Sequence, residues 1–458
     1  MKRNLALILI IYLLGLLIGG LYVGMVAPVR TVIQASFGVD DTVGIWVINI
    51  YTLFYAAFIP IMGKLADRVG RKRVFAACLG LFAVGALLCG LCTLGGATTA
   101  GFALLLLGRV LQAIGAGGII PVANAEIGVT FPADKRGMAL GIAAATIGLA
   151  NVLGSAVGSA LLGLLGTDNW AWLFLGCVPL CLLLAVAAWF LLPSNTMERG
   201  GKLDMLGAVL FVSFVLFLLL AFKGLDPQRL SASLIAPGFW ALLIAAIALA
   251  LAFRSVEHRA ADPVFHTEYL HRRPIVITML VSFFIGAVTI SMTLIPQYAE
   301  FLMDAQLGSG GYYMAVIGVF SLLGPVLGGK LIDRVGPKPV LMTGLVVAFL
   351  GFVFLALVVT PRPSPVLLLL GLAIVGLGMG FAMGAPTNYM VLENVDESES
   401  TAAVSTIALV RQMGTTLAPA LFVGFIANNA TTGGYQAMML AVAACAALAA
   451  VALIPYRR

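Results

Sequence analysis

The sequence contains the charged stretch Gly63-Lys64-Leu65-Ala66-Asp67-Arg68-Val69-Gly70-Arg71-Lys72, which occurs a second time further along the chain. The second copy is Gly329-Lys330-Leu331-Ile332-Asp333-Arg334-Val335-Gly336-Pro337-Lys338, with eight of the ten positions identical. Each copy follows one long apolar run and precedes another. We therefore expect each copy to form a short charged hairpin between two membrane helices.

A second pair of segments repeats at nearly the same offset. Leu104-Leu105-Leu106-Leu107-Gly108 recurs as Leu367-Leu368-Leu369-Leu370-Gly371, and the glycine pair at 115 and 117 recurs at 378 and 380. The repeats indicate two halves with a common fold. Internal duplication in a helical membrane protein is typical of alternating-access transport.

The composition excludes a soluble protein. Hydrophobic residues make up 62% of the chain and charged residues 10%, so most of its surface must face lipid. The net charge of +7 comes from basic residues in short loops, which indicates membrane topology and not nucleic-acid binding. The cysteines lie in apolar runs, the three histidines fall in one loop, and no nucleophile pairs with a histidine. We therefore expect no metal, no cofactor and no enzymatic activity.

About 20 apolar residues span a bilayer as a helix, and this length predicts fourteen transmembrane helices in an all-α protein. They are 5–28, 43–62, 74–94, 101–130, 137–163, 171–192, 204–224, 233–253, 274–300, 310–329, 339–360, 364–390, 402–428 and 433–455. The repeated hairpin links helices two and three and then ten and eleven, so two extra helices separate the halves. The predicted architecture is six plus two plus six, with boundaries at 1–193, 194–271 and 272–458.

Basic residues predict the orientation. With both termini in the cytoplasm, twenty lysines and arginines lie on the inner side and four on the outer side, which is a strong bias under the positive-inside rule. Arg109 and Arg411 are left inside helices. We expect a multi-pass protein of the cell membrane, with the lipid bilayer as its main partner.

Several motifs resemble the major facilitator superfamily, and in particular its fourteen-helix drug/proton antiporter branch. The first copy of the repeat is similar to the superfamily's signature loop. The other motifs are Arg109-x-x-Gln112-x-x-Gly115, Gly154-Ser155-x-x-Gly158, Asp204-x-x-Gly207 and Arg411-Gln412-Met413-Gly414. The chain departs from the branch at three places. Helix one has no acid near Gly19, and Glu300 replaces the usual glutamine. In the branch's antiporter motif, which here begins at Gly154, Ser155 and Ser159 replace the proline and the last glycine.

The resemblance implies that the repeated loops latch the two halves together on the cytoplasmic side. Gly63 and Gly70 allow a tight turn, and Asp67 gains from the dipole if it lies near a helix N-terminus. The alternative is a solvated loop with no special role. The candidate latch residues are Gly63, Asp67, Arg68, Gly70, Arg71, Asp333 and Arg334.

Arginines inside the membrane are candidates for substrate binding or gating. A central arginine costs about 2.5–3.5 kcal/mol on insertion scales, so Arg109 should face the interior and have a partner, such as Glu126. Its counterpart in the second half is Leu372, so the fold itself does not require the charge. The alternative is a brace to backbone carbonyls. The full set of candidates is Arg109, Gln112, Arg411, Gln412 and Asn151.

Two acids could be embedded in the membrane, Glu126 late in helix four and Glu300 at the outer end of helix nine. A buried carboxyl can exchange protons near neutral pH, so either is a candidate for proton coupling. The alternatives are an interfacial residue for Glu126 and an exposed residue at the outer mouth for Glu300.

These observations predict a secondary active transporter that exports amphipathic organic compounds in exchange for protons. Tyr22, Tyr51, Phe54, Tyr55 and Tyr298 could line an apolar cavity for such a substrate. A lipid or anionic metabolite carrier of the same fold is the alternative, favoured by the two embedded arginines and the missing acid of helix one.

Overall fold

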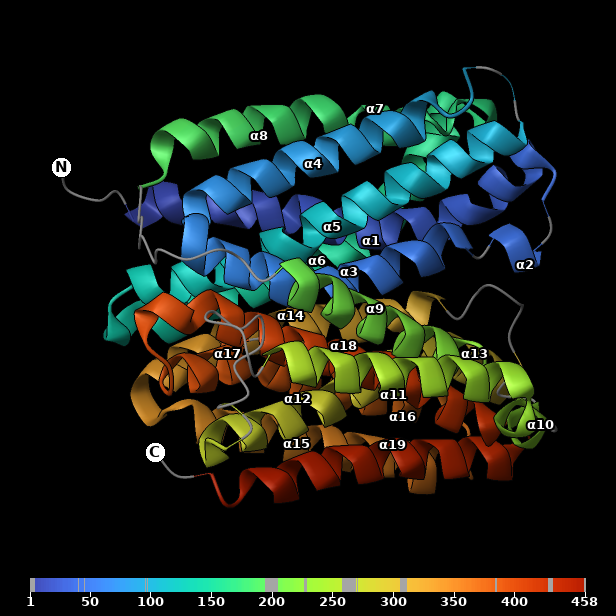
Figure 1. Ribbon diagram of the computed structural model, residues 1–458. Coiled ribbons are helices and arrows are strands. Elements are labelled where there is room, and N and C mark those ends of the chain that lie inside the picture. Colours follow the sequence, from blue (N-terminus) through green and yellow to red (C-terminus); the bar gives the residue numbers. More distant parts are fainter. Residues whose placement is uncertain are drawn as a thin grey trace. The chain divides into compact units, whose positions relative to one another are not determined.

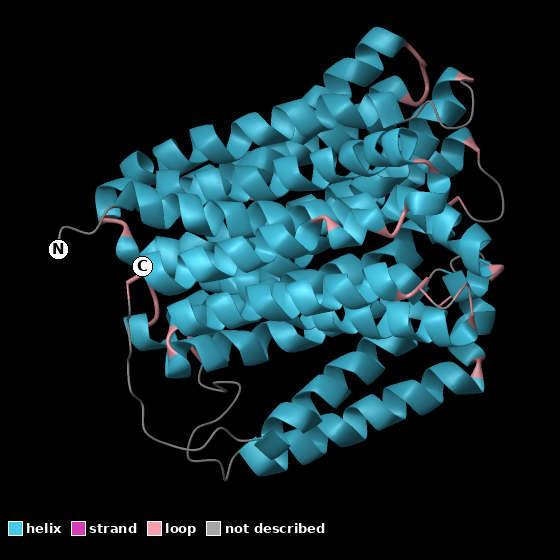
Figure 2. Ribbon diagram, turned by 90° about the horizontal axis from the view of Figure 1, so that it is seen from above, coloured by secondary structure: helices cyan, strands magenta, loops and turns pink. Residues whose placement is uncertain are grey.

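The computed structural model is built from helices, and its described residues contain no strand (Figure 2). The described residues are 5–39, 41–44, 46–94, 96, 98–193, 205–225, 229–257, 269, 271–304, 311–383, 385–426 and 431–456. Continuous apolar runs without β-type alternation account for this, because a membrane helix satisfies all of its backbone hydrogen bonds internally.

The first half of the chain contains four long helices after the N-terminal one, and a break in the last span. Its helices are α1 (Leu5–Phe37), α2 (Asp41–Gly44), α3 (Trp46–Val69), α4 (Arg71–Leu91), α5 (Thr99–Thr130), α6 (Ala133–Leu165), α7 (Trp172–Leu175) and α8 (Cys177–Leu191). They are labelled in Figure 1.

The remainder of the chain contains a linker hairpin and a second set of long helices. They are α9 (Met205–Lys223), α10 (Leu230–Ile235), α11 (Pro237–Glu257), α12 (Arg273–Ser291), α13 (Ile295–Met303), α14 (Gly311–Val335), α15 (Pro337–Phe354), α16 (Pro365–Ala382), α17 (Ala385–Leu392), α18 (Ser400–Gly424) and α19 (Thr432–Leu453). A π-helical turn, Leu355–Val359, extends α15.

Eleven helices of the described part are long and apolar enough to cross a membrane. Each of the fourteen predicted ranges overlaps a helix, but the number of spans and the six-plus-two-plus-six arrangement stay predictions. The expected charged hairpins are themselves mostly helical. α3 continues to Val69 and α4 starts at Arg71, so only Gly70 breaks the helix, with a φ of 106° that favours glycine.

The chain forms two compact units, each of which includes a short segment from the other half. Unit 1 comprises Met1–Thr130, Thr146–Lys202 and Glu397–Ser405, and unit 2 comprises Phe131–Ala145, Leu203–Asp396 and Thr406–Arg458. The first residues of α18 therefore belong to unit 1, and the first residues of α6 belong to unit 2. The predicted boundaries after residues 193 and 271 remain predictions.

Glycines set the close packing inside unit 1. α4 lies along α5 (Figure 1), and a Cβ at Gly85 would stand 2.6 Å from the carbonyl oxygen of Gly108 and the amide nitrogen of Gln112. Only a residue without a side chain permits this approach, and small residues are how membrane helices come close. The same contact fixes the α5 turn that carries Gln112.

Unit 2 repeats this packing with the equivalent helices. α15 lies along α16, and a Cβ at Gly344 would stand 2.8 Å from the carbonyl oxygen of Gly378. α14 also packs on α16, as α3 packs on α5 in unit 1. The duplicated sequence thus gives duplicated helix contacts, each within its own unit.

Candidate functional site

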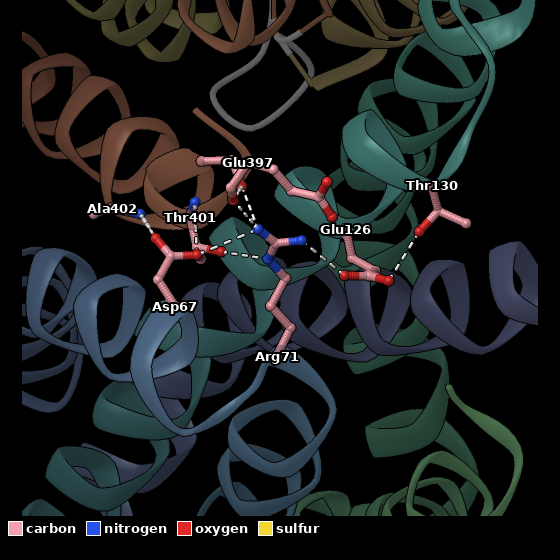
Figure 3. Close-up of polar contacts among 8 residues, drawn as sticks. Asp67, Arg71, Glu126, Thr130, Glu397, Thr401 and Ala402 are labelled. Carbon is pink, nitrogen blue, oxygen red and sulfur yellow. Dashed lines mark hydrogen bonds and ion pairs between the residues drawn. The ribbon is translucent and has the colours of Figure 1, made fainter. Parts of the chain in front are cut away.

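A polar cluster in unit 1 surrounds the first copy of the repeated motif (Figure 3). Asp67, in the last turn of α3, accepts hydrogen bonds from the first backbone amides of α18. The Thr401 nitrogen lies 3.2 Å from Oδ1 and the Ala402 nitrogen 2.7 Å from Oδ2. These amides have no partner within their own helix, and the helix dipole favours a negative charge there. Asp67 therefore lies at the N-terminus of α18, a helix far from it in the sequence, where it accepts from the first amides.

Arg71 is the cation of this cluster. Its guanidinium lies 3.1 Å from Oε2 of Glu126 and 3.4 Å from Oδ1 of Asp67, and all three side chains are nearly enclosed. The hydroxyl of Thr130 donates to the other Glu126 oxygen at 2.8 Å. Glu126 therefore pairs with Arg71 and not with Arg109, the partner considered from the sequence.

The same guanidinium also contacts the start of α18. Its Nε donates to Oγ1 of Thr401 at 2.9 Å, and Nη2 donates to the carbonyl oxygen of Glu397 at 2.6 Å and to the Ser400 hydroxyl. We call Asp67, Arg71, Glu126, Ser400 and Thr401 the Asp67 cluster. It joins segments more than 300 residues apart in the sequence.

The remaining predicted residues of the first loop support this contact or lie beside it. A Cβ at Gly63 would stand 2.9 Å from the carbonyl oxygen of Thr401, so α3 approaches α18 closely at a residue without a side chain. Arg68 is half-buried in the last turn of α3. Its role stays a prediction.

The second copy of the motif makes the equivalent contact in unit 2. Asp333, in the last turns of α14, accepts from the Gly137 nitrogen at 2.6 Å and from the Met138 nitrogen at 2.9 Å, both near the start of α6. Gly137 and Met138 each stand 264 residues before Thr401 and Ala402, the amides that Asp67 binds. Arg334 is exposed.

In the contact around Asp333, the arginine does not stand at the position equivalent to Arg71. Pro337 stands where the first copy has Arg71, and the guanidinium of Arg136 lies 5.8 Å from the ring centre of Tyr389. Tyr389 stands 263 residues after Glu126, and Arg136 stands 264 residues before Ser400. We call Asp333, Arg136, Gly137, Met138 and Tyr389 the Asp333 cluster. A cation–π contact here occupies the place of the Arg71–Glu126 ion pair.

Arg109 is enclosed in unit 1 between α3, α4 and α5. Its Nε donates to the carbonyl oxygen of Val47 at 3.1 Å, Nη1 donates to Oε1 of Gln112 at 2.8 Å, and the guanidinium lies 4.2 Å from the ring centre of Tyr51. Only 2% of its surface is exposed. Among the residues that the structure describes, no carboxylate pairs with it.

The other residues predicted to act in transport lie outside the two clusters. Arg411 and Gln412 are half-buried in α18, in unit 2, where the Gln412 carbonyl accepts hydrogen bonds from the Thr415 and Thr416 hydroxyls. The side chain of Asn151 lies outside the described residues. Glu300 is half-buried in α13. Nothing in this geometry tests their roles.

The sequence alone missed several members of the two clusters. Ser400 and Thr401 follow Glu397 at the start of an apolar run, which is a helix N-terminus signal. The repeat offset relates Ser400 and Thr401, next to the start of predicted helix thirteen, to Arg136 and Gly137 at the start of predicted helix five. Applying that offset would have identified the second contact. Tyr389 could have been found in the same way from Glu126.

The fold and the two clusters define a multi-pass helical membrane protein in which each of two related units contains a helix start from the other half. The Major Facilitator Superfamily model matches residues 12–419, and the chain belongs to this family of transporters. It is therefore an MFS transporter, in a family of transporters and not of enzymes.

Three curated relatives and one solved structure illustrate the similarity. The "Uncharacterized MFS-type transporter YfiU" of Bacillus subtilis (strain 168) is 34% identical over 421 residues, covering 91% of this chain and 79% of that protein. "Multidrug resistance protein 3" of the same organism is 28% identical, covering 92% and 79%. "Riboflavin transporter RibZ" of Clostridioides difficile (strain 630) is 27% identical, covering 93% and 89%. A double tryptophan mutant of XylE shares the fold, with a TM-score of 0.74 at 15% identity and coverage of 99% and 95%.

Proposed function

We propose that this protein is a secondary active transporter that exports amphipathic organic compounds in exchange for protons. It would belong to the fourteen-helix branch, lie in the cell membrane and have both termini in the cytoplasm. Support comes from the similarity to a multidrug resistance protein and a riboflavin transporter, two proteins named for organic compounds. The positive-inside bias supports the orientation.

The observation that carries the transport mechanism is the pair of aspartate–helix contacts. Asp67 and Asp333 each bind two backbone amides at the start of a helix that continues into the other unit. Contacts of this kind are discrete and can be made or broken as a whole. We propose that they form in one state of an alternating-access cycle and open in another.

Glu126 is the better candidate for linking protons to this cycle. It is 2% exposed and bound to Arg71, so protonation would remove the negative half of an enclosed ion pair. The Asp67 cluster would then lose a restraint on Arg71. Glu300 is half-buried and stays the alternative.

The test is transport in proteoliposomes under an imposed pH gradient, inside acidic or inside alkaline. A fluorescent amphipathic dye should move against its own gradient in one orientation of the pH gradient and stop when the gradient is collapsed. Glu126→Gln should abolish the pH-driven component while Glu300→Gln retains it. Equal pH-driven transport by wild type and both variants would reject proton coupling through these residues.

A second candidate function is a carrier of lipids or anionic metabolites. The observation that favours it is Arg109, an enclosed cation without a paired carboxylate in the described part of the chain. A labelled lipid and a labelled organic anion in the same proteoliposomes would distinguish the two functions.

A further inference from the structure

We propose that Arg109, Gln112 and Tyr51 form a binding site for one negatively charged group, the carboxylate of an organic substrate. The inference rests on the proposed function, since it assumes that an organic compound is transported, and it names the chemistry by which that compound is bound. Three independent features of the same place in unit 1 support it.

The first feature is the charge balance around Arg109. A guanidinium keeps its charge in proteins, and a buried charge is costly unless a counter-charge lies beside it. Its described contacts are the Val47 carbonyl, the Gln112 amide oxygen and the Tyr51 ring, all of which are neutral. Leu372 occupies the equivalent position in the second half, so the helix packing does not require a cation here.

The second feature is a pair of donors that have no hydrogen-bond partner. The Tyr51 hydroxyl and the Gln112 side-chain nitrogen are both fully buried and unpaired among the described residues. A buried polar group without a partner costs about 1–3 kcal/mol, so each is expected to have one in some state of the protein. Gln112 presents its oxygen to Arg109, which leaves its NH₂ group to donate elsewhere. Both of these unpaired groups can donate a hydrogen bond, and Arg109 supplies a positive charge beside them, so an acceptor with negative charge is a complementary ligand.

The third feature is an aromatic face that leads away from Arg109. Tyr51, Phe54, Tyr55 and Phe58 are spaced by three and four residues and so share one side of α3. Tyr51 and Tyr55 are parallel, with ring centres 6.1 Å apart, and Phe54 and Phe58 stack at 6.2 Å. Tyr51 is enclosed, whereas the other three rings are half-buried.

This arrangement matches an amphipathic aromatic anion. Its carboxylate would bind Arg109, Gln112 and the Tyr51 hydroxyl, and its apolar part would lie along the Tyr55, Phe54 and Phe58 side of α3. The other two tyrosines predicted to line a cavity do not contribute in this way, because the Tyr22 hydroxyl donates to the Leu173 carbonyl and Tyr298 bonds to Thr360.

The decisive variant is Gln112→Glu, which has nearly the same shape. It would place a carboxylate about where the amide oxygen now lies, 2.8 Å from Nη1 of Arg109, and so supply an internal counter-charge. An external anion would no longer be attracted. A second variant, Tyr51→Phe, removes only the unpaired hydroxyl and keeps the ring against the guanidinium. Arg273→Gln, an exposed arginine at the start of α12, is the control for loss of a positive charge elsewhere.

The measurement is thermal unfolding of the full-length protein in detergent, without any gradient. Sodium benzoate is compared with sodium chloride at equal ionic strength, and benzylammonium chloride with ammonium chloride. We expect benzoate to raise the unfolding midpoint of wild type and of Arg273→Gln in a saturable manner, and benzylammonium to have no such effect. Tyr51→Phe should need a several-fold higher benzoate concentration, and Gln112→Glu should not respond although its midpoint without ligand is at least that of wild type.

Three outcomes would overturn the proposal: equal shifts by benzoate and benzylammonium, a shift by chloride as large as that by benzoate, or a Gln112→Glu response like that of wild type. If Gln112→Glu does not fold, an unchanged benzoate response in Tyr51→Phe is the result that rejects the site. Failure of proton-driven transport in proteoliposomes would reject the proposed coupling but leave these binding results unaffected.

Discussion

The replacement Asp67→Asn tests whether the aspartate–amide contact holds the start of α18. Asparagine can keep one acceptor oxygen, but the NH₂ group then faces either the Thr401 or the Ala402 amide and cannot accept from it. One bond to a charged acceptor is lost and the other becomes neutral. Hydrogen bonds to charged groups contribute about 1.5–3 kcal/mol each.

The geometry limits the total effect. The Asp67–Arg71 pair at 3.4 Å is also weakened, but Arg71 keeps its closer contact of 3.1 Å with Glu126. We therefore expect the contact to lose about 2–4 kcal/mol, which corresponds to an opening equilibrium roughly 30- to 1000-fold more favourable.

Amide hydrogen exchange measures this opening directly, because exchange of a protected amide follows its local opening free energy. Peptides containing Thr401 and Ala402 should exchange faster by that factor in Asp67→Asn, while peptides containing Gly137 and Met138 should be unchanged. Asp333→Asn is the matched control and should give the reverse pattern, with a smaller effect because the Asp333 carboxylate is less enclosed than that of Asp67. Unchanged exchange at 401–402 in a folded Asp67→Asn protein would refute the reasoning.

The other predictions use different parts of the chain. Gly85→Ala should lower the unfolding midpoint, since its Cβ would meet backbone atoms of α5 at 2.6 Å and overpacking costs about 1–3 kcal/mol. The control is Gly80→Ala on the same helix, which meets nothing within 4 Å and should be neutral or stabilising. A similar midpoint for both variants would contradict the packing. Tyr389→Phe should leave transport near the wild-type rate because the ring remains under Arg136, and Tyr389→Leu should reduce it several-fold; equal rates would show that the ring face is not used. Single cysteines introduced at 72 and 338 into a variant lacking the native cysteines should react with a membrane-impermeant thiol reagent from the cytoplasmic side, and opposite sides would reject the predicted topology.

Apolar length and the repeated motif were sufficient to predict the helices and the family. A span of about 20 apolar residues has few alternatives to a helix in lipid, so each predicted range overlaps one. The ends were less accurate, as with α6, which starts at Ala133 and not at 137. Charged and polar residues such as Asp134 are compatible with a helix that extends past the apolar core of the bilayer, and hydropathy cannot detect them.

The sequence predicted only those contacts of the candidate site that join residues a few positions apart on one helix. Arg109 and Gln112 are three residues apart on one helix, and the structure brings them together as that spacing implies. The partners of Asp67 are 334 and 335 residues away, and no local pattern specifies which helix start it binds. The Arg71–Glu126 pair is likewise fixed by the packing of α4 on α5 and not by sequence distance.

The two clusters have the same aspartate–amide contact but differ in the position of the arginine and in its partner. Each copy has an aspartate that binds two amides at the start of a helix, at equivalent positions. The arginine, in contrast, comes from Arg71 in one cluster and from Arg136 in the other, and its partner is Glu126 in the first and Tyr389 in the second. Only in the first cluster, among the described residues, is the arginine paired with a carboxylate; in the second, Asp134 acts electrostatically on Asp333. If Glu126 takes up a proton during transport, as proposed, that proton acts directly on the ion pair of Arg71 and has no counterpart in the contact of Arg136 with the Tyr389 ring.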